Sequence, residues 1–272
     1  MKKLRIFFTI LLLLPFTPAL LPLQAQTWFV KAGGGLGSQW GAAGPVTAAR
    51  IGIGYEYEFN QFLTFAPSLS LATRGWQNPD VDTPDMLFDD QGNRLDTDGH
   101  ITTDPAQQAQ RPVIDGEGNP IAGQYMLSKM HRSFTTNYIQ LDLPFVYYHR
   151  IGESRYLTLT AGPWLACGVF GNAVTEGDGR EAGARKLRYT DKTFHLDGAR
   201  RFDAGLKAGI GYQFPSSLTV NVEGEFGLIK TNTASSLTPV YLDPWGNRAS
   251  RSFDVMITIA YKLNKSKWKY EE

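Results

Sequence analysis

The sequence contains a single cysteine, Cys167, among 272 residues. One cysteine excludes an intramolecular disulfide and any CxxC redox or zinc chemistry. The chain also lacks a charge imbalance, because 27 Lys and Arg stand against 26 Asp and Glu, which gives a formal net charge of +1. Domains that bind nucleic acids carry a clear basic excess, so this balance argues against a nucleic acid as a partner.

Long hydrophobic runs are scarce as well, and the one at the N-terminus is short. A basic start is followed by an apolar stretch from Ile6 to Phe16 and by a small-residue site that ends at Ala25. This layout predicts a secretory signal peptide over residues 1–25, cleaved before Gln26, and hence an exported protein. The alternative is a transmembrane anchor, but a helix needs about 20 apolar residues to cross, and this stretch is shorter.

The sequence is rich in segments where apolar and polar residues alternate, which is the pattern of a β-strand with two different faces. In residues 201–214, apolar side chains occupy the even positions, whereas Asp203 and Lys207 lie between them. Eight segments follow this pattern: 27–38, 47–59, 62–75, 133–150, 155–170, 201–214, 217–230 and 251–263. We therefore predict eight antiparallel strands.

The connections between these segments alternate in length. Tight turns join the second segment to the third, the fourth to the fifth and the sixth to the seventh, whereas residues 76–132, 171–200 and 231–250 form long connections. Short turns on one side, long loops on the other and an even number of strands are typical of an outer-membrane β-barrel. The sequence therefore predicts an all-β fold: an eight-stranded antiparallel up-and-down transmembrane β-barrel over residues 26–264. The long loops are then extracellular, and residues 265–272 form a periplasmic tail.

The direction of the apolar face needs a separate argument, because a soluble lipocalin-like binding barrel has the same alternation with its apolar face inward. Here the polar face is rich in glycine, which suits a narrow and filled interior. Aromatic residues also gather at the strand ends beside the short turns, as in the girdle at a membrane interface. They are Trp28, Tyr57, Phe59, Phe62, Tyr147, Tyr212, Phe214 and Tyr261. We therefore expect the apolar face to contact outer-membrane lipid.

With this orientation, the charged residues of the strands point into the lumen. An eight-stranded barrel is only wide enough inside for side chains, so we expect these charges to pair and to close the lumen. The predicted lumen charge network consists of Lys31, Glu56, Glu58, Asp142, Asp203, Lys207, Glu223, Glu225 and Asp254, with Arg50, Arg74 and Lys262 nearer its ends. We expect no metal and no other cofactor.

The stretch NYIQLDLPFVYYHRIG, residues 137–152, has an aspartate and a proline within an apolar run. Pro144 excludes a helix and disfavours a regular central strand, because proline has no N–H to donate. In the barrel interpretation, Leu141 and its odd-numbered neighbours face lipid, and Asp142 and Pro144 face the lumen. We expect a β-bulge or a lost ladder hydrogen bond at Pro144, near the periplasmic end.

A short pattern recurs in the long loops: two apolar residues, an aspartate, two variable residues and Gly-Asn. It occurs as LFDDQGNRL from residue 87, VIDGEGNPI from 113 and YLDPWGNRA from 241. Aspartate at the start of a turn with glycine three residues later is a hairpin signature, so we expect small hairpins above the membrane. The alternative is a ligand-binding surface. The loop over residues 76–131 is acidic, and its DTDG fragment lacks the other ligands of a calcium loop.

Catalytic signatures are absent from the sequence. None of the histidines His100, His131, His149 and His195 lies in an HExxH motif, and no GxSxG motif is present. We therefore expect no catalytic residues and no enzymatic activity.

Several strand segments resemble a known family. NYIQLDLPFVYYHRIG is similar to the YLEIPLLLKY segment of the PorT-like outer-membrane β-barrel proteins of the Bacteroidota. FDAGLKAGIGYQF, VNVEGEFGLI and FDVMITIAYKL resemble the last three strands of that family. The resemblance implies the same barrel fold, carries no catalytic residue and implies a link to type IX protein secretion.

Two functions therefore stay open. The first is a non-enzymatic outer-membrane barrel with a closed lumen, whose surface loops bind a partner or ligand. The second is an accessory component of a secretion or envelope-assembly machinery, with envelope or secretion proteins as partners. The sequence leaves the oligomeric state open.

Overall fold

The computed structural model describes residues 26–40, 42, 44–91, 93–181, 185–196, 199–232 and 250–263. The predicted signal peptide, the predicted periplasmic tail and the hairpin motif at residue 241 lie outside the described residues. Among the described residues, the helical elements are the short 3-10 turns η2 (Pro105–Gln107) and η3 (Thr193–His195). No helix in these ranges is both long enough and apolar enough to cross a membrane.

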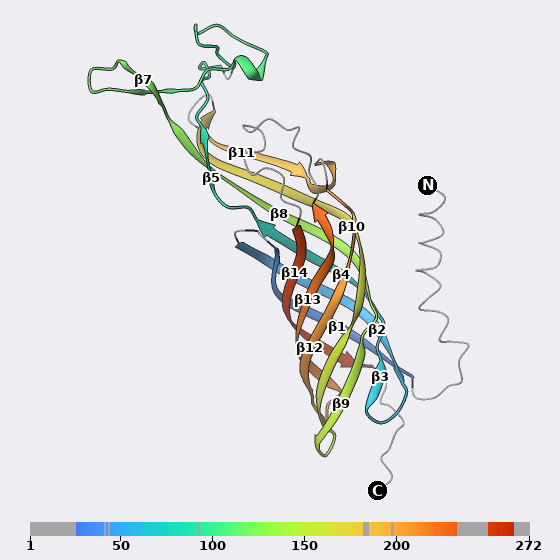
Figure 1. The fold of residues 1–272 in the computed structure, drawn as a ribbon. Helices are drawn as coiled ribbons and strands as arrows, with labels where there is room; N and C mark the ends of the chain where they lie inside the picture. Colours follow the sequence, from blue (N-terminus) through green and yellow to red (C-terminus); the bar gives the residue numbers. More distant parts are fainter. Residues whose placement is uncertain are drawn as a thin grey trace, which may run out of the picture.

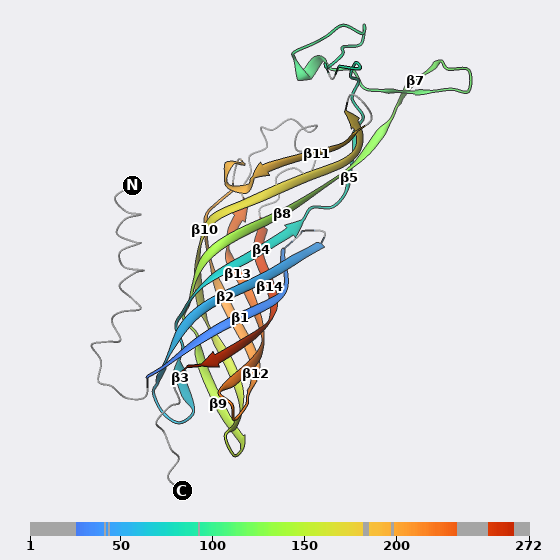
Figure 2. The same ribbon diagram turned by 180° about the vertical axis from the view of Figure 1, so that it is seen from behind.

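The strands form a closed antiparallel ring, which confirms the predicted fold class (Figures 1 and 2). β1 pairs with both β14 and β2, and these two pairings close the barrel. The ring has eight strand positions, of which β3 and β4 share one and β8 and β9 share another. Its strands are β1 (Gln26–Gln39), β2 (Gly44–Glu58), β3 (Leu63–Phe65), β4 (Ser68–Gln77), β8 (Leu127–Asp142), β9 (Phe145–Gly152), β10 (Arg155–Glu181), β12 (Phe202–Gln213), β13 (Leu218–Asn232) and β14 (Ser250–Lys262).

Prolines explain the two divided positions. Pro67 separates β3 from β4, Pro144 separates β8 from β9, and Pro163 lies next to Pro144 across the ladder with β10. Each proline carbonyl still accepts a ladder hydrogen bond of 2.9 Å, from the backbone N–H groups of Tyr55, Ala66 and Leu143 respectively. Because proline has no N–H, the reciprocal bond of each pair is missing. The register continues across the break without an extra residue, so the outcome at Pro144 is a lost ladder bond and not a bulge.

Exposure alternates along the strands in the predicted direction. The charged residues Lys31, Lys207, Asp142, Asp203, Asp254, Glu223 and Glu225 are 0–6% exposed, inside the barrel. Outward-facing aliphatic residues, such as Ile51, Leu71, Leu206, Val222 and Ile257, are 46–65% exposed. A soluble barrel with an inward apolar face is therefore excluded. Leu141 is on the outer face but only 6% exposed, since it lies between Leu69 and Leu165 of the neighbouring strands.

An aromatic girdle surrounds the periplasmic end of the outer face. Trp28 packs edge-on against Tyr55, with ring centroids 5.3 Å apart, and Phe59 stacks on Phe145 at 6.2 Å. On the other side of the barrel, Tyr212 packs against Phe214 at 4.6 Å. Aromatic rings at this position match the headgroup region of a bilayer. β1 starts and β14 ends at this same end of the barrel, next to β3 and β9 (Figure 1).

The long connection over residues 76–132 is more ordered than the sequence suggested. β8 and β10 continue beyond the barrel and stay paired as far as Met130 and Gly177. β5 (Val81–Pro84) pairs with β8, and β11 (Arg185–Lys192) pairs with β10, so the extension is a four-stranded sheet. Beyond it, β6 (Pro112–Ile114) and β7 (Pro120–Tyr125) form a hairpin. We call the described residues of 78–132 and 171–192 the arm. It projects from the end opposite the short turns (Figures 1 and 2).

Candidate functional site

The lumen charges come from seven strands that surround one level of the barrel interior. Inward positions of β1, β2, β4, β8, β12, β13 and β14 supply Lys31, Arg50, Arg74, Asp142, Asp203, Lys207, Glu223, Glu225 and Asp254. We call these nine residues the plug. A tilted, narrow barrel brings inward side chains of strands on opposite sides within contact distance. The plug therefore joins residues that are up to 223 positions apart in the sequence, as with Lys31 and Asp254.

Glu225 is the centre of the plug. Its Oε1 lies 2.6 Å from Nη1 of Arg50, and its Oε2 lies 2.7 Å from Nη2 of Arg74. Lys207 Nζ approaches the same carboxylate at 3.5 Å. Gln140 Nε2 donates to both Glu225 oxygens at 3.1 Å. One buried carboxylate thus links three cations, and such multiple pairing is what makes a charge tolerable away from water.

Arg74 holds the extracellular half of the plug. Its Nε lies 2.6 Å from Asp254 Oδ2, and its Nη1 lies 3.4 Å from Asp203 Oδ2. The guanidinium group also lies 4.3 Å from the ring centroid of Trp164, a cation–π distance. Trp164 fits there because Gly205 lies on the facing strand: a Cβ at residue 205 would come within 2.6 Å of the indole ring. Glycine on this strand therefore makes room for the ring that supports Arg74.

Two lysines hold the periplasmic half of the plug. Lys31 Nζ lies 2.5 Å from Asp142 Oδ2 and donates to Ser68 Oγ at 2.7 Å. Lys207 Nζ lies 3.0 Å from Glu223 Oε2 and 3.7 Å from Asp142. The sequence analysis predicted Arg50 and Arg74 nearer the ends of the barrel. This prediction was wrong, because both guanidinium groups lie inside the plug. The plug contains four cations and five carboxylates, counting the nine residues named above.

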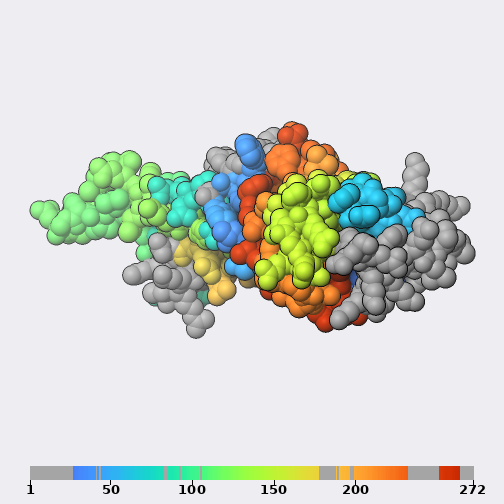
Figure 3. Space-filling model, turned by 90° about the horizontal axis from the view of Figure 1, so that it is seen from below, coloured from blue at the N-terminus to red at the C-terminus, as the bar shows by residue number. Residues whose placement is uncertain are grey.

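The two remaining predicted network residues lie apart from the plug. Glu56 pairs with Lys262, whose Nζ is 2.7 Å from Glu56 Oε2, and accepts a hydrogen bond of 3.0 Å from the hydroxyl of Tyr148. Glu58 is half-buried further toward the periplasmic end of β2. These residues belong to the periplasmic mouth, where Tyr148 and Tyr156 are part of a small apolar cluster. The atoms of the β9–β10 and β2–β3 turns pack around this end in Figure 3.

A small cavity separates the mouth from the plug. Its volume is about 50 Å³, and its lining includes Lys31, Lys207 and Glu223 on the plug side and Glu56 and Lys262 on the mouth side. A volume of this size holds about four water molecules. The described lumen therefore contains a small cavity with a charged lining beside the plug of paired charges.

The extracellular end of the lumen is covered by the chain after β11. Phe194 of η3 packs edge-on against Tyr138, with centroids 6.4 Å apart. Leu196 packs against an apolar cluster that contains Trp76 and Phe134, whose rings stack at 4.4 Å. The described residues thus place an apolar layer above the plug.

The arm contains three turns of one type. Asp115 Oδ1 accepts backbone hydrogen bonds from Glu117 at 2.9 Å and from Asn119 at 2.8 Å. The N–H groups of this turn, with that of Asn119 first, lower the pKa of Asp115. Asp89 forms the same contacts in the first predicted hairpin, so both predicted hairpins within the described residues are confirmed.

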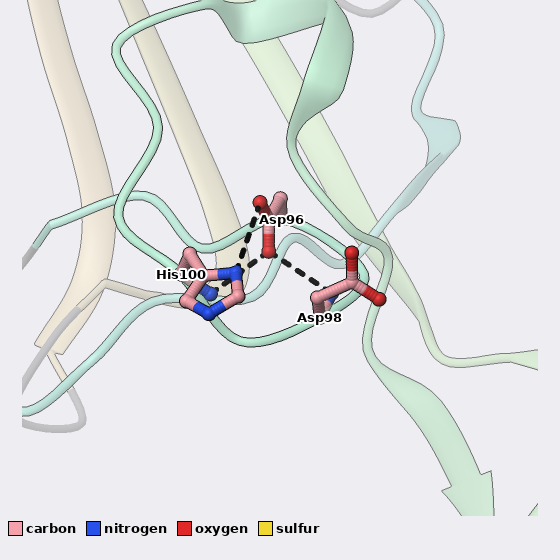
Figure 4. Close-up of side chains that lie close together, drawn as sticks. All are labelled: Asp96, Asp98 and His100. Carbon is pink, nitrogen blue, oxygen red and sulfur yellow. Dashed lines mark hydrogen bonds and ion pairs between the residues drawn. The ribbon is translucent and has the colours of Figure 1, made fainter.

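The third turn contains the DTDG fragment, which the sequence analysis compared with a calcium-binding loop. Asp96 Oδ1 accepts backbone hydrogen bonds from Asp98 at 2.9 Å and from His100 at 2.8 Å (Figure 4). Asp96, Asp98 and His100 lie close enough together to hold a cation, but their proximity follows from the turn itself. Gly99 has a φ of +80°, the left-handed conformation that the turn needs. The motif is therefore Asp-x-x-Gly with Asn or His after it, and the sequence reading missed this copy because it required asparagine.

The four histidines of the sequence lie outside the lumen. His131 Nδ1 is 2.9 Å from Asp80 Oδ1, a polar contact on the surface of the arm. His195 is an exposed residue of η3, and His149 is exposed on β9 near the periplasmic end.

These features define a transmembrane β-barrel of the outer-membrane class, with lipid-facing aliphatic residues, an aromatic girdle and a charged, filled lumen. The chain belongs to the family described as "Outer membrane protein beta-barrel domain", whose model matches residues 38–232. Curated protein sequences give no match.

Solved structures of outer-membrane proteins are similar to this chain at low identity. A major outer membrane protein of Thermus thermophilus is 12% identical, with a TM-score of 0.37, over 88% of this chain and 100% of that one. Ail, the attachment invasion locus protein of Yersinia pestis, is 10% identical, with a TM-score of 0.34, over 89% and 100%. The outer membrane enzyme PagL is 11% identical, with a TM-score of 0.28, over 85% and 97%.

Proposed function

We propose that this protein is a non-enzymatic surface-interaction protein: a closed outer-membrane barrel that anchors an extracellular arm, and the arm binds a partner. The observation that carries the proposal is the continuous strand β10, which runs from Arg155 at the periplasmic turn to Glu181 in the arm. The sheet of the arm is thus a direct continuation of the barrel wall. A binding surface on such a sheet is held rigidly at a fixed position above the membrane.

The composition of the longer of the two arm segments supports a binding role. Residues 76–131 contain ten Asp or Glu against three Lys or Arg. Large apolar side chains nevertheless stay 45–63% exposed along the arm, at Ile101, Ile114, Tyr125, Met126 and Leu127. Lipid covers the exposed apolar residues of the barrel, whereas those of the arm lie above the membrane. Exposed apolar groups with a polar rim are typical of protein–protein contact surfaces, here for a partner with a basic, partly apolar surface.

The lumen supports the absence of transport. The side chains of the plug are only 0–6% exposed to solvent, and they contact one another. The Glu56–Lys262 ion pair forms a second closure at the periplasmic mouth. Opening a path would separate several buried ion pairs, each of which costs about 3–5 kcal/mol to break. The barrel is therefore proposed as an anchor and not as a channel.

A shortened arm tests this proposal. Pro84 and Leu127 are paired residues of β5 and β8, so an Asn-Gly turn can replace residues 85–126 without moving either strand. We expect this variant to insert normally and to run as a heat-modifiable band, but to lose the surface partner that cross-linking captures on cells with the full-length protein. Capture of the same partner by both proteins would contradict the proposal.

The segment at residues 137–152 that resembles PorT-like proteins supports a second candidate, an accessory role in type IX-like secretion. Loss of exported cargo on deletion of the whole protein, restored by the shortened-arm variant, would favour this candidate over the first. Normal export after deletion would exclude it.

A further inference from the structure

Two cations lie directly opposite each other on the lipid-facing side of the barrel. Lys230 of β13 pairs in register with Arg251 of β14, and both side chains are exposed. Their strand neighbours point the other way: Thr231 accepts a hydrogen bond of 3.0 Å from Gln39 in the lumen, and Ser252 donates one of 2.7 Å to Asp203. Lys230 and Arg251 therefore face outward.

A bulge in β13 creates this juxtaposition. Between the pairs Phe226–Phe253 and Lys230–Arg251, β13 advances four residues while β14 advances two. In the regular register of the preceding pairs, Leu228 would lie opposite Arg251. The bulge instead leaves the carbonyl of Leu228 free to accept a hydrogen bond of 3.2 Å from Arg251 Nε. Bulges re-aim side chains at barrel rims, and here the result is a pair of adjacent cations with one guanidinium group held in place.

The pair lies at the level of the outer lipid headgroups. Ten residues lie between Arg251 and Lys262 at the periplasmic end of β14, within the range of about 9–11 residues that a tilted strand needs to cross the hydrocarbon layer. Trp40, which directly follows the neighbouring strand β1, is 72% exposed, and its backbone N–H donates to the backbone carbonyl of Arg251. A tryptophan at this position marks a membrane interface. Below the cations the outer surface is apolar, formed by Leu228 and Phe253.

Nothing in the described chain balances these charges. No carboxylate of the described ranges lies within 4.0 Å of the Lys230 ammonium or the Arg251 guanidinium group. Like charges opposite each other on a sheet face destabilise it, and an anion bound beside them would offset this repulsion. Both side chains face the lipid headgroup layer beside the barrel, which can supply one.

We propose that Lys230 and Arg251 form a binding site for the phosphate group of an outer-leaflet lipid. The guanidinium group offers paired N–H donors that match phosphate oxygens, and the lysine adds a second positive charge. The acyl chains of the lipid then lie along Leu228 and Phe253 below. The site is independent of the arm and of its partner.

Native mass spectrometry of the full-length protein in detergent tests the site, with phosphorylated lipid A as the probe. We expect one retained lipid A molecule per barrel, and retention about tenfold weaker in the double variant Lys230→Gln/Arg251→Gln. The control Lys129→Gln/Lys192→Gln removes the same charge from exposed positions of the arm and should retain lipid A like the unchanged protein. Heat-modifiable migration of all three proteins shows that each is folded.

Two further measurements identify the source of the phosphate. The unchanged protein should retain lipid A without phosphate groups as weakly as the double variant retains phosphorylated lipid A. Inorganic phosphate should not displace phosphorylated lipid A from the unchanged protein. Equal retention by the unchanged protein and the double variant would overturn the proposal. Full displacement by inorganic phosphate would also overturn it, because the site would then recognise a free anion and not a lipid.

Discussion

Replacing Arg74 with methionine would remove a cation on which two buried carboxylates depend. Asp203 and Asp254 are 0% and 1% exposed, and within the described chain Arg74 is the cation within 4.0 Å of each of them. The change also takes one of three cations from Glu225. Removing one partner of a buried ion pair costs about 3–5 kcal/mol, because it leaves an uncompensated charge behind. We therefore expect Arg74→Met to lower the free energy of unfolding by at least that amount.

Urea-induced unfolding from lipid vesicles, followed by tryptophan fluorescence, measures this loss. Arg188 provides a matched control, since it pairs with Glu176 at 3.2 Å on the arm while both side chains stay more than half exposed. An exposed pair contributes about 0–1 kcal/mol, so Arg188→Met should change the unfolding free energy by no more than that. If Arg74→Met proved no more destabilising than Arg188→Met, the account of the plug would be refuted.

Two companion variants keep the test informative if Arg74→Met fails to insert. Arg74→Lys retains the charge but cannot reach three carboxylates at once, and it should cost about 1–3 kcal/mol. Asp254→Asn combined with Arg74→Met removes one of the stranded charges and should restore at least about 0.5 kcal/mol relative to additivity.

Three further outcomes follow from the fold. Ile257→Arg places a charge on the lipid face and should destabilise the inserted barrel by about 2–4 kcal/mol, whereas Ile114→Arg on the arm should not change its unfolding by urea; equal effects would reject the assigned faces. Gly118 has a φ of +88°, so Gly118→Val should strain the β6–β7 hairpin by about 1–3 kcal/mol and speed its proteolysis without changing barrel stability. Hydrogen bonding lowers the pKa of Asp115 in the folded hairpin. The Asp115 carboxylate therefore stabilises the hairpin fully above the ordinary aspartate pKa, and this stabilisation is lost as the pH falls through the lowered pKa. Amide exchange at Asn119 should accordingly rise in acid, and a pH-independent rate would contradict this.

The strand pattern was predictable because lipid and lumen impose opposite chemistry on successive residues. The alternation around Lys207 and Ile257 therefore identified both the strands and their faces. Pro144 was predictable as an interruption of the ladder, but the sequence left a bulge and a lost hydrogen bond both open. The alignment of Pro67, Pro144 and Pro163 across neighbouring strands depends on register, which the sequence alone does not give.

Features that depend on pairing between distant strands were not predictable. The position of Arg74 inside the plug follows from three partners on β12, β13 and β14, because a long side chain can reach away from the level of its own Cα. The bulge before Lys230 interrupts the alternation only locally. The length of β10 was underestimated because beyond Phe170 the bulge at Val169 reverses which residues face inward, and the strand leaves the membrane, where no apolar face is required.

In the proposed function, the barrel anchors the protein in the membrane and the arm binds a partner. Seven strands contribute the paired charges inside the barrel, and β8 and β10 continue the wall of the barrel into the sheet of the arm. Changes in the arm should consequently alter binding of the partner and leave insertion of the barrel intact. Changes in the plug should lower the stability of the inserted barrel.

Conductance across a planar lipid bilayer tests the closed lumen most directly. The unchanged protein, inserted from detergent into a bilayer in molar potassium chloride, should give no stepwise current, because the plug and the Glu56–Lys262 pair close the path at two levels. Reproducible conductance steps from the folded, heat-modifiable protein would contradict the account and would make the barrel a channel.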